Sequence, residues 1–372
     1  MISAEAMSDE FQELVRIDSL SLQEGAVAEV VMGKLRAMGL DVQQDRAHER
    51  IGGQTGNVIA KVPATRAGLP TVMLNAHLDT VAPGQGVMPE CRGDDILSVS
   101  ETILGADDKA GVTVILAAVR EILVSGAAHG ELQIAFTIAE EIGLHGAQYL
   151  DYSLIKPDYA FVFDGGRDIG TLTVAAPSAQ KMTWKVTGRA AHAGVCPEKG
   201  VNAVQIAAEA IAAMKMGRLD EESTANIGHI EGGAARNIVP DLCEVWGEAR
   251  SHNEAKLAAQ VSHMQRCFED AVGRHEGAGL EREIQSSYHR FRLSEEDEVV
   301  RVASAAARKL GLEVKLETGG GGSDANIFNE KGIPAVICAT GARDPHSLGE
   351  TVSISGMAKA AEWLVGMVTA GG

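Results

Sequence analysis

The segment NAHLDTV, residues 75–81, places an imidazole and a carboxylate two positions apart, directly after the apolar run TVML. Side chains two apart in a strand point to the same side, so His77 and Asp79 face together if the strand continues that far. One of them could bind a metal ion while the other orients it, or the two could form an ordinary surface hydrogen bond. The pair alone favours the hydrogen bond, so any metal site needs ligands from elsewhere in the chain.

Other segments place carboxylates or imidazoles where a predicted strand ends or a helix begins. The five segments carry His77 with Asp79, Asp107 with Asp108, Glu140 with Glu141, Asp164, and His346. Ligands of open α/β sheets bind outside the carboxyl ends of the strands. A single acidic residue after a strand is usually a helix N-cap or a turn residue. Five such segments together favour a functional site.

The side chains in these segments suggest a pair of metal ions. Oxygen and nitrogen ligands without sulfur suit Zn²⁺, Mn²⁺ or Co²⁺, and we expect zinc first. Several carboxylates cannot share a dry pocket unless cations neutralise them. Two divalent ions about 3.5–4 Å apart can polarise a carbonyl group and activate a water molecule between them.

Composition limits the class of protein. The 372 residues are 45% hydrophobic and 23% charged, which is typical of a globular chain with room for two domains. The net charge of −18 argues against nucleic acid or an anionic membrane as partner. We expect no membrane span, because apolar runs stay shorter than about 18 residues. Five cysteines without a C-x-x-C motif, and an acidic amphipathic N-terminal segment, predict a cytoplasmic protein.

Predicted helices and strands alternate over residues 1–177 and again over 287–372. Helical spacing covers 8–17 and 24–39, and the runs TVMLNAHLD, ELQIAFTIAEE and PDYAFVFDGG are predicted strands. The turn GADDKAG leads into a helix of about 15 residues. This order predicts an α/β domain with a mainly parallel mixed sheet and helices on both faces.

The pattern differs over residues 178–286. Strand, helix, strand, strand, helix and strand follow one another there, with the second helix over 253–275. This is the order of the ferredoxin-like split βαβ motif. We therefore expect an inserted α+β domain that interrupts the first domain.

Several of these segments resemble one family. The motifs NAHLDTV, ILGADDKAG, AEEIGLHGA, FDGG and HSLGE look like those of peptidase T and its relatives, a group of dinuclear metallo-exopeptidases that includes carboxypeptidase G and aminoacylases. The resemblance covers nearly the whole chain. It implies a phosphorylase/hydrolase-like catalytic domain with an inserted lid or dimerisation domain. The late histidine departs from the family pattern, in which a glutamate usually follows the histidine closely.

The resemblance implies a role for each residue at the strand ends. His77 and Asp164 would bind one metal ion, Glu141 and His346 the other, and Asp107 would bridge both. An aspartate at position 164 accompanies the aminopeptidase and tripeptidase members of the family, whereas a glutamate accompanies carboxypeptidases and deacylases.

Four residues beside these ligands receive supporting roles. Asp79 would hold His77 in the correct tautomer. Glu140 would be the general base that takes a proton from the water molecule between the metal ions. Asp108 is expected to start the following helix, with Lys109 as a nearby ion-pair partner.

Three residues of the inserted domain are candidates for substrate contacts. His192, in GRAAHAGV, resembles a family histidine that stabilises the oxyanion, often in the partner subunit's site. From the sequence alone a surface turn is an equal explanation. Asn237 is a candidate for contacting the partner's substrate. Arg250 could bind the substrate carboxylate with its guanidinium fork, or form a structural ion pair.

A glycine-rich run, GGGGSD, occupies residues 319–324. Gly321 would let the backbone approach the substrate closely. The alternative is a flexible turn with Ser323 or Asp324 as the N-cap of a helix. A phosphate-binding loop is not expected, because the Lys-Ser/Thr pair of such loops is missing after the glycines.

These expectations combine into one prediction of function. We expect a cytoplasmic metallopeptidase with two divalent ions that releases N-terminal residues from short peptides. The alternatives are a carboxypeptidase or N-acyl-amino-acid amidohydrolase, and a catalytically silent binding protein on the same fold. The exposed sheet edge of the inserted domain and its Ala-, Val- and Ile-rich helix at 201–213 predict a homodimer.

Overall fold

The computed structural model describes residues 2–369 and divides the chain into two compact units. Unit 1 comprises Met1–Ala176 and Phe291–Gly372, and unit 2 comprises Pro177–Arg290. Unit 2 extends beyond the predicted insertion of 178–286 at both ends. Among residues 2–369, none of the helices is both long and apolar enough to cross a lipid bilayer.

A nine-stranded mixed sheet forms the centre of unit 1. Its strands are β1 (Asp41–Gln44), β2 (Val58–Val62), β3 (Val72–His77), β6 (Leu132–Thr137), β7 (Tyr159–Gly165), β8 (Thr171–Ala176), β14 (Phe291–Arg292), β15 (Lys315–Thr318) and β16 (Ala335–Ala339). The order is β1-β2-β6-β3-β7-β16-β8-β14, with β15 beside β8. The four central strands, β6-β3-β7-β16, are parallel, and antiparallel strands flank them. The predicted mainly parallel sheet is therefore confirmed.

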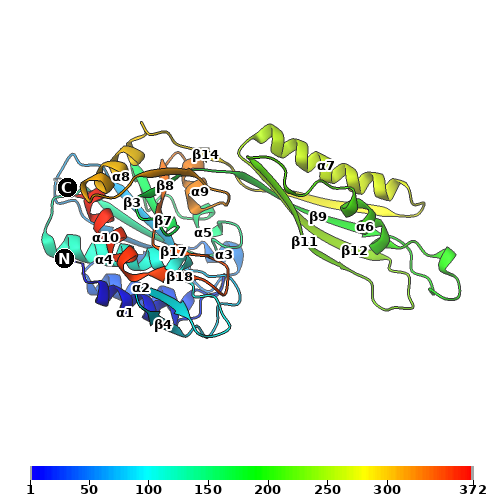
Figure 1. The fold of residues 1–372 in the computed structure, drawn as a ribbon, viewed down its shortest axis with the longest axis horizontal. Helices are drawn as coiled ribbons and strands as arrows, with labels where there is room; N and C mark the ends of the chain where they lie inside the picture. Colours follow the sequence, from blue (N-terminus) through cyan, green and yellow to red (C-terminus); the bar gives the residue numbers. More distant parts are fainter. Residues whose placement is uncertain (1, 370–372) are drawn as a thin grey trace. The chain divides into compact units, whose positions relative to one another are not determined.

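Helices cover both faces of this sheet. They are α1 (Ala4–Val15), α2 (Gly25–Ala37), α3 (His48–Ile51), α4 (Ala106–Ser125), α5 (His145–Gln148), α8 (Glu298–Lys309), α9 (Asp324–Glu330) and α10 (Ile354–Val368). Helix α4 packs against β3 and β7 and contacts α1 and α10 (Figure 1). Alternate residues such as Leu74 and Phe163 belong to the core on that face. The residues between them, including Asn75, point to the opposite face, where α9 packs against β7 and β16.

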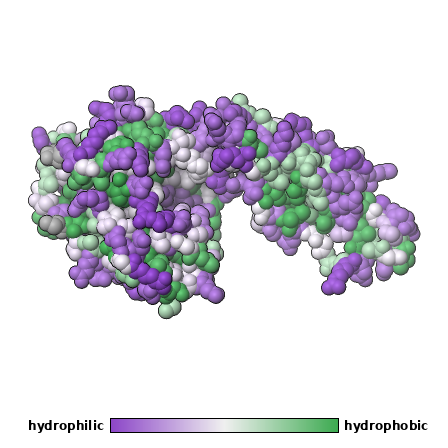
Figure 2. All heavy atoms as spheres, viewed as in Figure 1, coloured by the Kyte–Doolittle hydropathy of each residue, from purple (hydrophilic) through white to green (hydrophobic). Residues whose placement is uncertain are grey.

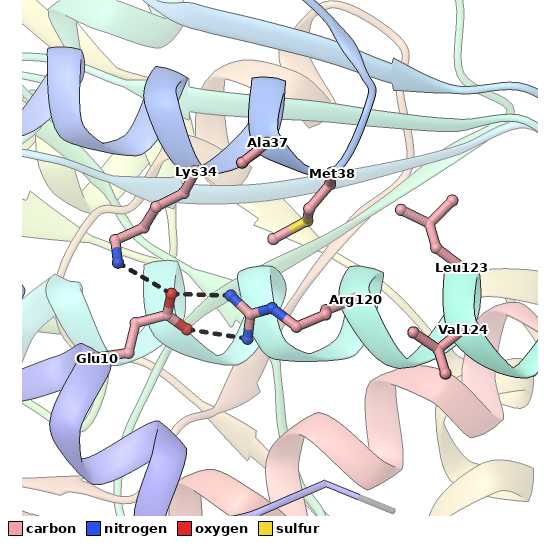
Figure 3. Close-up of a pocket in the computed structure, with 7 residues that line it drawn as sticks. All are labelled: Glu10, Lys34, Ala37, Met38, Arg120, Leu123 and Val124. Atoms are coloured by element: carbon pink, nitrogen blue, oxygen red, sulfur yellow. Dashed lines mark hydrogen bonds and ion pairs between the residues drawn. The ribbon is translucent and has the colours of Figure 1, made fainter.

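A buried carboxylate joins three of the helices. Glu10 of α1 is 7% exposed, and it accepts two hydrogen bonds from the guanidinium of Arg120 in α4, at 2.9 and 3.3 Å. The ammonium of Lys34 in α2 lies 3.3 Å from the same carboxylate (Figure 3). A carboxylate this deeply buried is tolerated because cations pair with it. The network therefore fixes the positions of α1, α2 and α4.

A small antiparallel sheet in unit 1 carries the loop of residues 344–350. Its order is β17-β18-β5-β4, with the bounds β4 (Pro89–Arg92), β5 (Asp95–Ser98), β17 (Ala342–Arg343) and β18 (Thr351–Ser353). Strands β17 and β18 pair directly, so residues 344–350 form the loop of a hairpin. His346 lies in this loop with a left-handed φ of 60°.

Unit 2 is a five-stranded antiparallel sheet with two α-helices. Its elements are β9 (Ser178–Thr187), η1 (Pro197–Lys199), α6 (Ala203–Ala212), β10 (Gly217–Arg218), β11 (Ser223–Gly232), β12 (Leu242–Ser251), α7 (Glu254–Gly273) and β13 (Gly279–Tyr288). The sheet order is β10-β11-β12-β9-β13 (Figure 1). Without the short β10, this is the predicted ferredoxin-like arrangement.

The core of unit 2 is almost entirely apolar. Trp184 stacks on Phe268 of α7 with ring centroids 4.6 Å apart, and its indole N–H donates to Gln265 at 2.9 Å. Both α-helices of the unit contribute to this one cluster. The face of the sheet that lies away from them carries exposed side chains, including Trp246. Figure 2 shows hydrophobic residues among hydrophilic ones on the visible face of the molecule.

Candidate metal centre

The ends of three parallel strands meet at one edge of the central sheet. His77 is the last residue of β3, Asp164 lies near the end of β7, and Glu140 and Glu141 follow β6. Strands β6, β3 and β7 are adjacent and parallel, so their carboxyl ends lie side by side. Alternation along the strands turns His77 and Asp164 away from the α4 face.

Asp107 joins two histidines at this edge. The Nε2 of His77 lies 3.0 Å from Oδ1 of Asp107 and 3.9 Å from Oδ1 of Asp164. The Nε2 of His346 lies 3.3 Å from Oδ2 of Asp107 and 2.9 Å from Oε1 of Glu141. The two oxygens of Asp107 thus face different histidines, which is the arrangement that a bridging carboxylate requires.

These residues form overlapping groups of possible metal ligands. Ligand atoms lie within 4.8 Å of one another in three groups: His77 with Asp107 and Asp164, Asp107 with Glu141 and His346, and His77 with Glu140 and Glu141. The donors are imidazole nitrogens and carboxylate oxygens, which suit a divalent ion such as Zn²⁺. The residues present therefore fit a pair of metal ions.

The electrostatics of the site favour added positive charge. Burial raises the pKa of Asp164 well above its usual range, and the nearby charge of Asp107 raises it further. Burial also raises the pKa of Glu140. Burial opposes ionisation of Asp107, but hydrogen bonds from His346 and His77 outweigh it and lower the pKa of that carboxyl. Hydrogen bonds to Asp107 and Glu141 raise the pKa of His346 to about 10. Crowded carboxylates of this kind are neutralised by protons or by cations.

Asp79 binds the backbone of both glutamates. Its carboxylate accepts the backbone N–H of Glu140 at 2.9 Å and of Glu141 at 3.2 Å, and the hydroxyl of Ser21 at 2.6 Å. The Nδ1 of His77 lies 2.9 Å from the backbone carbonyl oxygen of Asp79 and 3.4 Å from the carboxylate. The backbone carbonyl is therefore the nearer partner of His77, while the Asp79 side chain orients the glutamates.

The start of α4 is shaped by Asp108. Its carboxylate accepts the backbone N–H of Gly111 and of His77, both at 3.1 Å, so it begins the helix as expected and also links it to β3. A side chain at position 111 would clash, because a Cβ there would lie 1.9 Å from a carbonyl oxygen of β7. The prediction for Lys109 was wrong: its buried ammonium donates to the carbonyl of Ile17 at 2.7 Å instead of pairing with a carboxylate.

The buried carboxylates of Glu24 and Asp324 lie close to the site, although the sequence did not predict a place for them there. Glu24 accepts the backbone N–H groups of Leu22 and Ala139, each at 2.9 Å. Burial, together with the charge of Asp79, raises the pKa of Glu24 to about 7. The second is Asp324, described next. Neither was placed at the site from the sequence, because Glu24 reaches Ala139 and Asp324 reaches Thr137, each far away along the chain.

Asp324 is the first residue of α9, and Ser323 is the N-cap, so one of the two predicted caps is observed. The Asp324 carboxylate accepts hydrogen bonds from the Thr137 hydroxyl and, at 3.5 Å, from the side-chain amide of Asn75. Burial raises the pKa of Asp324 to about 6. Gly321 is exposed in the turn that precedes this cap.

In unit 2, His192 and Asn237 lie together. The backbone N–H of Ala193 donates to the carbonyl of Asn237 at 2.9 Å, and His192 forms an isolated antiparallel β-bridge with Ile238. The Nδ1 of His192 accepts the N–H of Gly194 at 3.1 Å, which places the ring proton on Nε2 as a free donor. Both His192 and Asn237 are exposed.

Arg250 lies at the opposite end of the same sheet. It pairs with Ala179 at the start of β9, whereas His192 follows the end of that strand. A strand of ten residues spans roughly 30 Å. The guanidinium of Arg250 makes two hydrogen bonds of 3.0 Å to the carboxylate of Glu248. The structure therefore separates Arg250 from the pair formed by His192 and Asn237.

Two family models match the chain. The model described as the peptidase dimerisation domain, M20_dimer, matches residues 175–276, which lie almost entirely in unit 2. The model described as peptidase family M28 matches residues 57–192, the part that contains His77, Asp107 and Asp164.

Similar proteins cover the chain almost from end to end. The crystal structure of aminopeptidase PepT from Bacillus cereus is 40% identical, with a TM-score of 0.86 over 99% of this chain and 98% of that one. A tripeptidase from Staphylococcus aureus is 36% identical, with a TM-score of 0.91 and the same coverage. Peptidase T from Listeria welshimeri is 26% identical over 97% of both chains.

Proposed function

Because the chain belongs to the M20 peptidases as a peptidase T-like member, we propose that the cluster around Asp107 is the active site of a metal-dependent aminopeptidase that acts on short peptides. The family resemblance predicted from the sequence is confirmed, and hydrolysis of the tripeptidase or aminopeptidase type follows from it. The observation that carries the assignment of the site is the position of Asp107 between His77 and His346.

We assign the metal ligands as two sets that share one carboxylate. His77 and Asp164 would hold one ion, Glu141 and His346 the other, and Asp107 both. The separate directions of the two Asp107 oxygens support this division. Two divalent cations, with zinc as our first choice, would polarise the scissile carbonyl and make a water molecule nucleophilic.

Glu140 is the proposed general base. Its carboxylate would accept a proton from the attacking water and deliver it to the amine of the leaving peptide. Glu140 is only 7% exposed, and burial raises its pKa. The raised pKa lies closer to the pH at which this carboxyl must act first as a base and then as an acid. The two backbone hydrogen bonds to Asp79 hold Glu140 and Glu141 in a fixed orientation.

Residues of unit 2 and the glycine run would bind the substrate. The Nε2–H of His192 is suited to donate to the oxyanion, and Asn237 lies beside it. Arg250 retains guanidinium N–H groups beyond the two that bind Glu248, and these could hold a substrate carboxylate. Gly321 would let the exposed turn before α9 approach the peptide backbone.

We further propose a homodimer formed through unit 2, in which His192 and Asn237 act in the partner's site. The match to a dimerisation domain supports the dimer. The length of β9 between Arg250 and His192 supports a contribution of His192 to the partner's site, because one short peptide cannot easily reach both ends of the sheet. A cytoplasmic location is also proposed, supported by five cysteines that are all free thiols.

Product analysis of a defined peptide set tests this function. The purified protein is incubated with a free tripeptide and with its N-acetylated and C-amidated forms, with and without chelator. We expect release of the N-terminal residue from the free tripeptide and, more slowly because Arg250 loses the carboxylate, from the C-amidated one, with no cleavage of the acetylated peptide and loss of activity with chelator. Release of the C-terminal residue, or cleavage of the acetylated peptide, would contradict the aminopeptidase assignment.

A further inference from the structure

Glu350 binds the turn that carries Asp107. It is 1% exposed and ends the loop between β17 and β18. One carboxylate oxygen accepts the backbone N–H of Leu104 at 2.8 Å and of Gly105 at 2.7 Å. The other accepts the N–H of Asp107 at 2.9 Å. One side chain therefore satisfies three backbone donors at the entry to α4.

The bound turn has an irregular backbone. Gly105 has a left-handed φ of 75°, and Asp107 has extended backbone angles although it lies within the bounds of α4. Leu104 and Gly105 are buried, so their N–H groups have no access to water. A buried donor that loses its acceptor is costly, and the turn would shift to find another.

Glu350 also belongs to the loop that supplies His346. The pairing of β17 with β18 fixes both ends of this loop, and Glu350 fixes the loop to the turn before α4. His346 in turn lies 3.3 Å from Asp107 and 2.9 Å from Glu141. The hairpin loop and the turn at the start of α4 are far apart in the sequence, but Glu350 joins them beside the imidazole of His346 and the carboxylate of Asp107.

We propose that Glu350 is a positioning residue for the metal centre, because it holds Asp107 opposite His346. By doing so it sets the affinity for a metal ion at the position formed by Asp107, Glu141 and His346. The proposal rests on the ligands assigned in the proposed function. The Glu350 carboxylate binds the backbone N–H groups of Leu104, Gly105 and Asp107 and is not among the proposed metal ligands. Residues that orient metal ligands through hydrogen bonds typically change metal affinity about 10–100-fold when they are replaced.

The variant Glu350→Gln tests this role with little change in volume. Glutamine keeps one acceptor oxygen, but its NH₂ group replaces the other and faces an N–H donor. We expect the affinity for Co²⁺ or Zn²⁺ at one of the two positions to fall about 10–100-fold. The visible absorption of the Co²⁺-loaded protein should change as well, because it reports the geometry of the ligands.

Asp45→Asn is the matched control. Asp45 is 5% exposed, and its carboxylate accepts the backbone N–H groups of Ala47, Asn57 and Asp151. The chemical change is the same and the loss of stability should be comparable, but the metal affinity and the Co²⁺ spectrum should stay unchanged.

The outcomes separate the two proposals. Wild-type affinity and spectrum in Glu350→Gln, or equal losses in both variants, would overturn the role of Glu350. If Glu350→Gln does not fold at the assay temperature, Glu350→Asp decides in the same way, because it keeps the charge on a side chain one methylene shorter. A wild-type protein that binds no divalent metal under these conditions would instead overturn the proposed function.

Discussion

Buried ionisable side chains gather in unit 1, whereas the buried polar side chains described in unit 2 are serines and a glutamine. Those of unit 1 are Glu10, Glu24, Asp45, His77, Asp79, Asp108, Lys109, His129, Glu140, Asp324 and Glu350. Those of unit 2 are Ser178, Ser223, Ser251 and Gln265. Burying charge is costly unless a partner or a cation compensates for it. The stability of unit 1 should therefore depend on metal and pH, and that of unit 2 on apolar packing.

The largest effect is expected when the proposed shared ligand of unit 1, Asp107, is removed. Asp107→Ala should lose both metal ions and nearly all hydrolysis, because each ion would use one oxygen of this carboxylate. Metal content after gel filtration and tripeptide turnover measure the two losses. Asp220→Ala, at an exposed ion pair of unit 2, is the control and should change neither. Two tightly held ions in Asp107→Ala would point to Asp108 as the bridging residue.

A smaller change within the same cluster separates chemistry from metal binding. Glu140→Gln should retain both ions but lose hydrolysis on the order of 10²-fold or more, because the amide cannot accept the proton of the attacking water. Turnover and metal content are measured side by side. The exposed Glu283→Gln of unit 2 should behave as the wild type. Near-normal turnover in Glu140→Gln would remove this residue from the mechanism.

A mixing experiment tests whether the surface of unit 2 completes the site of a partner. A His192→Ala chain and a Glu140→Gln chain are each expected to be impaired alone. In their heterodimer, one site has its own Glu140 together with the partner's intact copy of the loop that carries His192. Activity should then reappear in proportion to the heterodimer fraction, measured by native mass spectrometry. Heterodimers that form without recovering activity would show that His192 serves its own subunit.

The smallest expected effect concerns the pH dependence of unit 1. Burial raises the pKa of Glu24 from its ordinary value of 4.5 to about 7, so the folded state holds this proton more tightly than the unfolded state. The favourable contribution is complete below pH 4.5 and is lost as the pH rises to about 7. Glu24→Gln keeps an acceptor for Leu22 and Ala139 without the charge. It should gain stability over the wild type at pH 8, on the order of 1–2 kcal/mol, and little at pH 4.5.

Tryptophan fluorescence can observe this effect in unit 1 alone. Of the three tryptophans, Trp184 and Trp246 lie in unit 2 and Trp363 in unit 1. Urea unfolding of metal-free protein is therefore followed in a Trp184→Phe, Trp246→Phe background, with Glu283→Gln as the control. An equal stability difference between Glu24→Gln and its parent at both pH values would contradict the prediction.

Sequence reasoning was most successful where the strand pattern itself places the residues. His77 and Asp164 could be placed at one edge because β3 and β7 are parallel runs that end there. The mainly parallel sheet and the ferredoxin-like insertion also follow from the order of the elements.

The residues that position the proposed ligands could not be identified from the sequence. Glu24, Asp324 and Glu350 each act on a segment that only the tertiary fold brings near. Asp79 was expected to orient His77, and its carboxylate lies 3.4 Å from Nδ1 of that ring, but its hydrogen bonds to the backbone of Glu140 and Glu141 were not foreseen. Hydrogen bonds to backbone groups leave no periodic pattern, so spacing alone could not reveal them.

The hairpin loop that carries His346 and Glu350 has a consequence for how the chain is made. Unit 2 is one continuous segment, but unit 1 is interrupted by it and needs residues beyond 290 for β14, β16 and this loop. During synthesis from the N-terminus, Asp107 emerges long before the residues that fix its turn and face its second oxygen. The proposed second metal position can therefore assemble only when the chain is nearly complete, whereas unit 2 has all of its sequence for folding earlier. Catalytic competence is thus among the last properties that the growing polypeptide acquires.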